Sequence, residues 1–142
     1  MSRKFVKRRR VEFRDTDMAG IVHFSVFFTY MEEAEHELLR ELELGVICEA
    51  DGRTVSFPRV NAECNYLNAI RFEENIDIEV TVSRIGEKSI TWQHTFRRGE
   101  DVVAKGTITT VCCLFHSGGG RPQSVPIPQK IVEALQPFMA AE

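Results

Sequence analysis

Two stretches of alternating apolar and polar residues, followed by a long apolar run, mark the second half of the chain. In the clearest stretch, residues 76–83, apolar side chains occupy the even positions and polar side chains the odd ones. The same period recurs at residues 90–97, and an apolar run covers residues 102–115. Turns at 85–88 and 98–101 separate these stretches, and each turn contains glycine. A period of two is typical of half-buried strands, so we predict three consecutive antiparallel strands.

Two further strands are expected earlier in the chain. Residues 55–67 alternate in the same way, with Val60, Ala62, Cys64 and Tyr66 on one side. Residues 5–14 are assigned to a first strand. The prediction is therefore an antiparallel sheet of about five strands.

One segment between the first two strands has a helical period instead. From Val26 to about Glu43, apolar residues recur at steps of three and four, with mostly acidic residues between them. The apolar positions are Phe27, Tyr30, Met31, Ala34, Leu38 and Leu42. Such a helix would be about 27 Å long, enough to cross five strands about 4.8 Å apart. We expect it to bury this stripe against the sheet.

A shorter helix is predicted after Pro128, with Ile131, Leu135 and Phe138 facing inward and Pro137 near its end. The order strand, long helix, four strands, short helix predicts an α+β fold with an antiparallel sheet around one long central helix. A chain of 142 residues fits a single domain, residues 1–142. The stretch 117–122, with three glycines and a proline, is interpreted as a loop.

Composition and charge exclude some classes of function. The formal net charge of -3 and a pI of about 5.8 argue against a protein dedicated to nucleic acid. The chain shows neither the apolar run of a signal peptide nor about 20 consecutive apolar residues. We therefore expect a cytoplasmic protein without a membrane span.

The cysteines and histidines do not form the spacing of a metal site. Cys48, Cys64, Cys112 and Cys113 are irregularly placed and are interpreted as free thiols, the last two as buried structural residues. His36, His94 and His116 are scattered. No metal site is expected.

The candidate catalytic segment is residues 12–25, which directly precedes the long helix. It reads Glu-Phe-Arg-Asp-Thr-Asp-Met-Ala-Gly-Ile-Val-His-Phe-Ser. Asp17 alone could be a turn residue, because Asp-x-Asp followed by glycine also suits a tight turn. Asp15 is expected to accept hydrogen bonds from loop amides. Gly20 would permit either a positive φ or the close approach of a substrate.

This segment, followed by aromatic residues and an acidic helix, resembles the 4-hydroxybenzoyl-CoA thioesterase branch of the hot-dog family. The pattern of that branch is Asp-x-Asp-x-x-Gly-x-Val followed by an aromatic-rich pair, and the order of expected elements agrees along essentially the whole chain. The resemblance implies hydrolysis of an acyl-CoA thioester, with Asp17 as the catalytic carboxylate. It also implies that the backbone amide of Phe24 polarises the thioester carbonyl, and that Gly20 and Val22 contact the substrate.

These roles are chemically reasonable for a thioester. Its thiol leaving group, with a pKa of about 8.5, departs as a thiolate without a strong general acid. An ionised carboxylate can attack the carbonyl to form an anhydride or accept a proton from water, and both roles stay open for Asp17. The first amides of a helix starting near Ser25 lack intrahelical partners and carry the positive end of the helix dipole. One such donor at the developing oxyanion lowers the barrier by about 3 kcal/mol.

The chain departs from the family at two places. Members linked to the Tol-Pal envelope system commonly have Tyr-His where this chain has His23-Phe24, so His23 could contact the acyl group, orient water or simply be a bonded loop residue. Relatives carry a basic run for the CoA phosphates before the fourth strand, where this chain keeps only Lys88 beside Glu87. Other candidates, each also interpretable as a solvated surface charge, are Arg59, Arg71, Arg84 and Arg121.

Three functions follow as hypotheses. The first is hydrolysis of an acyl-CoA, aliphatic or aromatic, with no cofactor besides the CoA of the substrate. The second is a non-catalytic hot-dog protein that binds acyl-CoA or a partner and does not need Asp17. The third, a hydroxyacyl dehydratase, requires a histidine paired with a distant carboxylate in the cleft. The family pairs sheets edge to edge, with active sites between subunits, which implies a homodimer or homotetramer.

Overall fold

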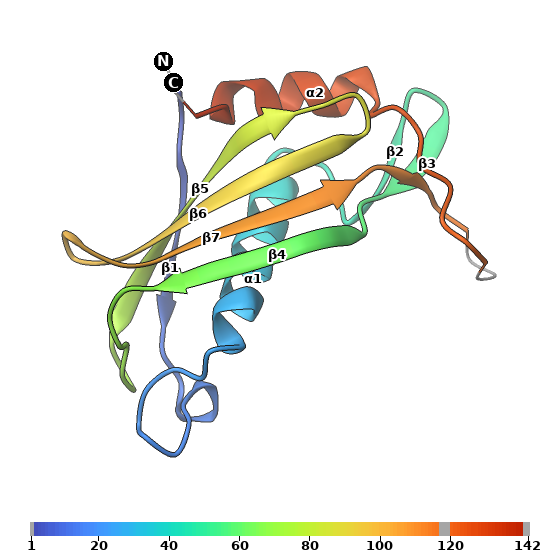
Figure 1. Ribbon diagram of the computed structural model, residues 1–142. Coiled ribbons are helices and arrows are strands. Elements are labelled where there is room, and N and C mark those ends of the chain that lie inside the picture. The colour runs from blue at the N-terminus through green and yellow to red at the C-terminus, as the bar shows by residue number, and fades with distance from the viewer. Residues whose placement is uncertain (1, 117–119, 141–142) are drawn as a thin grey trace.

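The computed structural model describes residues 2–116 and 120–140, and in it a five-stranded antiparallel sheet curves around one long helix (Figure 1). The strands lie in the order β1-β5-β6-β7-β4. Their bounds are β1 Phe5–Arg10, β4 Arg59–Tyr66, β5 Asn75–Ile85, β6 Ser89–Arg98 and β7 Asp101–Val111. The predicted hot-dog fold is thus confirmed. The part of the predicted loop at 117–119 lies outside the described residues.

Helix α1, Val26–Glu41, crosses the inner face of the sheet. The predicted stripe from Phe27 to Leu38 is buried, whereas Leu42 is half-buried and follows the end of the helix. Glu43 has a φ of 59°, a left-handed conformation that does not continue an α-helix. The acidic residues between the apolar positions, Glu35 among them, were predicted to form the polar side of the helix. For Glu35 this prediction is wrong, because it is buried with the apolar stripe.

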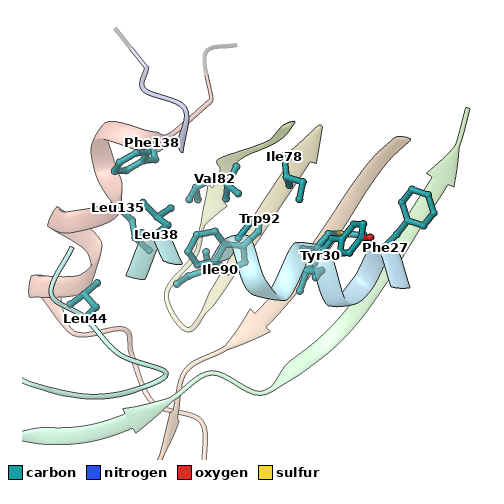
Figure 2. Close-up of a cluster of buried hydrophobic side chains, with 14 of the residues drawn as sticks. Phe27, Tyr30, Leu38, Leu44, Ile78, Val82, Ile90, Trp92, Leu135 and Phe138 are labelled. Carbon is teal, nitrogen blue, oxygen red and sulfur yellow. The ribbon is translucent and has the colours of Figure 1, made fainter. Parts of the chain in front are cut away.

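The core lies between α1 and the inward side chains of β5 and β6, whose burial alternates as the sequence pattern predicts. Helix α2, Gln129–Leu135, and the 3-10 turn η2, Gln136–Phe138, cover one end of this core. Figure 2 shows Leu38, Leu135 and Phe138 toward that end of the core, with Phe27 and Tyr30 farther along α1. The inward positions predicted for the second helix are confirmed.

Two predicted strands are divided in the structure. Residues 55–67 split into β3, Arg53–Ser56, and β4, because Pro58 between them has no amide hydrogen for a ladder. Residues 102–115 split into β7 and β8, Cys113–Leu114, where the amide of Cys112 instead bonds the carbonyl of Lys88 at 2.7 Å. Strands β3 and β8 form a small second sheet with β2, Ile47–Ala50, which was not predicted.

The first strand is also shorter than residues 5–14, because the chain turns after Arg10 into the 3-10 turn η1, Phe13–Asp15. The four cysteines are free thiols, and Cys112 and Cys113 are buried as expected. Of the helices in the described ranges, none has the length and apolar character needed to cross a membrane. The cytoplasmic location stays a prediction.

The two edge strands of the large sheet differ in burial. Strand β1 alternates between half-buried and exposed residues, as expected for a strand with one face on the core. Strand β4 pairs with β7, yet seven of its eight residues are exposed and only Cys64 is half-buried. The edge strand β4 therefore presents both faces to its surroundings.

Candidate active site

The loop before α1 is anchored by Asp15, whose side chain is buried. Its Oδ2 accepts hydrogen bonds from the hydroxyl of Tyr30 at 2.7 Å and from the amide of Glu12 at 2.9 Å, and lies 3.4 Å from Nη1 of Arg9. Burial, with the hydrogen bond to Asp15, raises the pKa of Tyr30, so its phenol stays a donor. The expected bonding of Asp15 to a loop amide is confirmed.

Asp17 closes a tight turn with one of its two carboxylate oxygens. Oδ1 accepts hydrogen bonds from the amides of Ala19 at 2.8 Å and Ile21 at 3.4 Å, while the amide of Asp17 donates to the carbonyl of Ile21 at 2.8 Å. Gly20 has a φ of 81°, which glycine adopts without strain. Oδ2 of Asp17 has no hydrogen bond or ion pair within residues 2–116 and 120–140. The turn role and a catalytic role are therefore compatible.

Backbone hydrogen bonds hold His23 and Ser25 on either side of Phe24. The amide of His23 donates to the carbonyl of Asp15 at 2.9 Å, and its carbonyl accepts from Val26 at 2.9 Å. The amide of Ser25 donates to Nδ1 of His23 at 3.3 Å, and the same Nδ1 lies 2.7 Å from Oγ of Ser25. His23 is thus bonded within the loop, and its roles in contacting the acyl group or orienting water stay predictions.

The backbone amide of Phe24 has no hydrogen-bond acceptor in the described part of the chain, whereas the amides of His23 and Ser25 each have one. Its carbonyl accepts a hydrogen bond from the hydroxyl of Tyr66 at 2.8 Å. Its ring is 64% exposed and stacks on His23 at 4.6 Å between ring centroids, so it is not part of the core. A free amide at the start of α1 is the donor expected of an oxyanion site.

A cavity of about 350 Å³ brings the principal candidates together. Asp17, Val22 and Phe24 line it from the loop, Phe27 lines it from α1, and residues 66–70 form another wall. Gly20 does not line this cavity, and a Cβ built on it would meet no atom within 4 Å. Its positive φ is therefore the reason for glycine, and close approach of a substrate is not needed to explain it.

Lys88 and Arg59 lie at the same end of the sheet, away from Tyr66 and the cavity. Lys88 directly precedes β6, and the first residues of β6 pair with the end of β7. Arg59 pairs with this same end of β7 from the other side. Arg59 is seven residue steps along β4 from Tyr66 at the cavity, about 23 Å at 3.3 Å per residue. Arg59 also contacts Glu35 at 3.1 Å and Glu32 at 3.6 Å. Neither cation lines the Asp17 cavity.

A buried polar cluster between α1 and β6 was not predicted from the sequence. Oε2 of Glu35 lies 2.8 Å from Nε2 of His94, although the ring N–H is not aligned for a hydrogen bond. Glu35 and Arg59 line a separate cavity of about 40 Å³. Steps of four from Phe27 through Met31 reach Glu35, so the helical period could have placed it inward.

This cluster does not support the dehydratase hypothesis, because neither Glu35 nor His94 lines the Asp17 cavity. Within the described ranges, no group of three or more His, Cys, Asp or Glu side chains could hold a metal ion.

Comparison with known proteins identifies the family. The sequence profile of the thioesterase-like superfamily matches residues 11–135. A 1,4-dihydroxy-2-naphthoyl-CoA hydrolase of Nostoc punctiforme is 28% identical, over 93% of this chain and 86% of that protein. The acyl-CoA thioesterase YbgC of Haemophilus influenzae is 22% identical, over 89% of this chain and 90% of that protein.

A solved structure agrees with these relatives. The structure of a gentisyl-coenzyme A thioesterase has a TM-score of 0.76 and 29% identity, and the match covers 89% of this chain and 98% of that one. The relatives with named activities are thioester hydrolases, which confirms the expected enzyme class. The match to the family profile covers most of the chain, and the chain belongs to the thioesterase-like superfamily.

Proposed function

We propose that this protein hydrolyses acyl-CoA thioesters to a free acid and CoA, with Asp17 as the catalytic carboxylate. One observation carries the proposal. A single cavity is lined by Asp17 and by Phe24. Within the described residues, Oδ2 of Asp17 has no partner, and the amide of Phe24 is the one of residues 23–25 without an acceptor. These are the two groups that thioester hydrolysis requires.

The chemistry follows from this arrangement. The thioester carbonyl oxygen accepts the hydrogen bond of the Phe24 amide, and the dipole of α1 adds positive potential there. Oδ2 of Asp17 then attacks the carbonyl carbon, or accepts a proton from a water that attacks it. In the first case CoA leaves as thiolate and water hydrolyses the anhydride. In the second, the tetrahedral intermediate breaks its C–S bond to give the acid, and the CoA thiolate takes up the proton that Asp17 accepted. Both routes consume one water and leave Asp17 regenerated.

We favour an aromatic acyl group, with an aliphatic one as the second candidate. The rings of Phe24, Phe27 and Tyr66 line the cavity, and flat apolar surfaces of this kind suit an aryl group. Asn68 also lines it, and its Oδ1 accepts from the amide of Ala69 at 2.9 Å, which leaves its NH₂ group to bind a ring hydroxyl. Two relatives carry names that specify hydroxylated aromatic acyl-CoA substrates.

We further propose a homodimer formed through β4, either alone or within a homotetramer. Strand β4 is exposed on both faces, including Val60 at 61%, and its outer edge would otherwise leave backbone groups unpaired. Antiparallel pairing of β4 with its copy brings the Arg59 end of one subunit to the Tyr66 end of the other. Lys88 of the partner subunit would then meet the CoA phosphates of the Asp17 site.

The 4-hydroxybenzoyl-CoA and Tol-Pal-linked branch is a finer assignment that we keep as part of the proposal. It is supported by the Asp-x-Asp-x-x-Gly-x-Val pattern and by similarity to the Haemophilus influenzae protein. The order His23-Phe24 departs from the Tyr-His common in that branch.

A substrate panel tests the function. Purified protein is assayed for thiol release from benzoyl-CoA, 4-hydroxybenzoyl-CoA, 1,4-dihydroxy-2-naphthoyl-CoA, acetyl-CoA and palmitoyl-CoA. We expect the highest kcat/KM for a hydroxylated aromatic substrate. Binding of these compounds without hydrolysis would favour the second hypothesis, a non-catalytic acyl-CoA-binding protein.

A further inference from the structure

The hydroxyl of Tyr66 makes a long-range contact with the loop before α1. It donates to the carbonyl oxygen of Phe24 at 2.8 Å, and the two residues are 42 positions apart in the chain. Tyr66 is the last residue of β4, whereas Phe24 lies just before the helix. The hydrogen bond therefore ties the edge of the sheet to the residue whose amide faces the proposed chemistry.

The hydrogen bonds of the loop explain why this contact bears on the Phe24 amide. On one side, the peptide group before Phe24 is fixed through the carbonyl of His23, which accepts from Val26 at 2.9 Å. On the other side, the peptide group after Phe24 is held by Tyr66 through its carbonyl. The Phe24 amide belongs to the first of these peptide groups, and the φ and ψ angles of Phe24 connect it to the second. Holding both groups therefore restricts rotation about these angles and limits the directions in which the amide can point.

The ring of Tyr66 is itself held in place. It packs edge to face on Phe27, with 4.9 Å between ring centroids and an angle of 81° between the planes. Partial burial, with Cys64 alongside, raises the pKa of Tyr66, so the phenol keeps its proton at neutral pH. The hydroxyl thus reaches the loop from a packed support.

We propose that Tyr66 is a positioning residue for the reaction, because it fixes the direction in which the Phe24 amide points. The inference rests on the proposed function, in which this amide stabilises the oxyanion. A group that improves only the alignment of an oxyanion donor affects the transition state more than the bound substrate. Loss of the hydroxyl is therefore expected to lower kcat and leave KM nearly unchanged.

The test compares Tyr66→Phe with Thr16→Val. The first variant keeps the ring and its contact with Phe27 but removes the hydroxyl. The second removes another hydroxyl-to-carbonyl bond of the same loop, from Thr16 to Phe13 at 2.7 Å, which does not involve Phe24. We expect about a tenfold fall in kcat for Tyr66→Phe and an unchanged kcat for Thr16→Val, with both melting temperatures close to that of the wild type.

A second measurement does not depend on turnover. In NMR spectra of the unliganded protein, Tyr66→Phe should shift the carbonyl carbon of Phe24 and shift or broaden its amide signal, whereas Thr16→Val should leave both in place. An unchanged kcat, unchanged Phe24 signals, or an equal loss of kcat in both variants would overturn the inference. Absence of hydrolysis by the wild type would instead count against the proposed function, and the NMR comparison would still test the position of the amide.

Discussion

Oε2 of Glu35 lies 2.8 Å from Nε2 of His94 in the interior of the protein, and the exposed fractions of these residues are 3% and 0%. The other oxygen of Glu35 accepts a hydrogen bond from Arg59 at 3.1 Å. Arg59 starts β4 and His94 lies in β6, so one carboxylate on α1 connects the helix to an edge strand and to the middle of the sheet. The stability of such a cluster depends on the charge of its central carboxylate, Glu35.

Replacement of that central carboxylate should destabilise the protein. Glu35→Ala leaves a partly buried guanidinium and a buried imidazole without their partner, and we expect a loss of about 2 to 4 kcal/mol in the free energy of unfolding. Glu32→Ala is the matched control, because it removes the exposed partner of Arg59 and should cost about 0.5 kcal/mol or less. Urea denaturation measures both. Equal effects would show that the buried contact adds no stability.

The sheet and the central helix were predictable because each rests on a repeated pattern. Strands β5 and β6 show the two-residue period over most of their length, and the stripe of α1 shows the helical one. The division at Pro58 could also have been foreseen, since proline cannot continue a central ladder. The short strands β2 and β8 have too few residues to display a period.

The candidate site was predictable only in part. The motif located Asp17 and Phe24, which share a cavity, but it did not identify Tyr66, because a hydrogen bond over 42 residues leaves no local pattern. The alternation at residues 90–97 placed His94 on the inward side, as the structure has it, whereas Glu35 was misjudged for another reason. Polar side chains at inward positions are rare, and whether such a residue is buried depends on a partner from a different element.

Asp17→Asn should separate the structural role of this residue from its chemical role. The amide side chain keeps an oxygen to accept the hydrogen bonds of Ala19 and Ile21, so the turn and the melting temperature should be preserved. It can neither attack the thioester nor accept a proton, so kcat should fall at least about a hundredfold. Steady-state assays with the best substrate of the panel provide the measurement. Turnover close to that of the wild type would exclude the proposed mechanism.

Phe24 offers a test of the backbone donor. Its ring is mostly exposed, so Phe24→Leu should keep most of the activity. Phe24→Pro removes the amide hydrogen and should cost about 2 to 4 kcal/mol in transition-state stabilisation, measured as kcat/KM. Proline also restricts His23, so a crystal structure or an unchanged melting curve must accompany the rate. An active, undistorted proline variant would place the oxyanion at another donor.

The proposed dimer can be tested at the two edges of the sheet. Val60 on β4 and Val6 on β1 are exposed to similar degrees, 61% and 50%. A charge at an interface between copies opposes association, so Val60→Asp should sediment as a monomer and lose activity, whereas Val6→Asp should behave like the wild type. Sedimentation velocity at micromolar concentration, together with the thioesterase assay, decides this. A wild-type protein that is monomeric and active would contradict the assembly.

Subunit mixing tests whether the active site is shared. Lys88→Glu should lower kcat/KM about tenfold, because the variant repels the CoA phosphates, while Asp17→Asn is inactive. Suppose that Asp17 and Lys88 of each site come from different subunits. A dimer of one Lys88→Glu subunit and one Asp17→Asn subunit then has one site with both changes and one site with neither.

After equal amounts of the two variants exchange subunits, half of the dimers are mixed and one of their two sites is intact. At substrate concentrations well below KM, the mixture should therefore recover about a quarter of the wild-type rate. If both residues of a site belonged to one subunit, no intact site would form, and the rate would stay near the average of the two separate variants, about a twentieth of the wild-type rate. That lower rate, measured after complete exchange, would reject a site that spans two subunits.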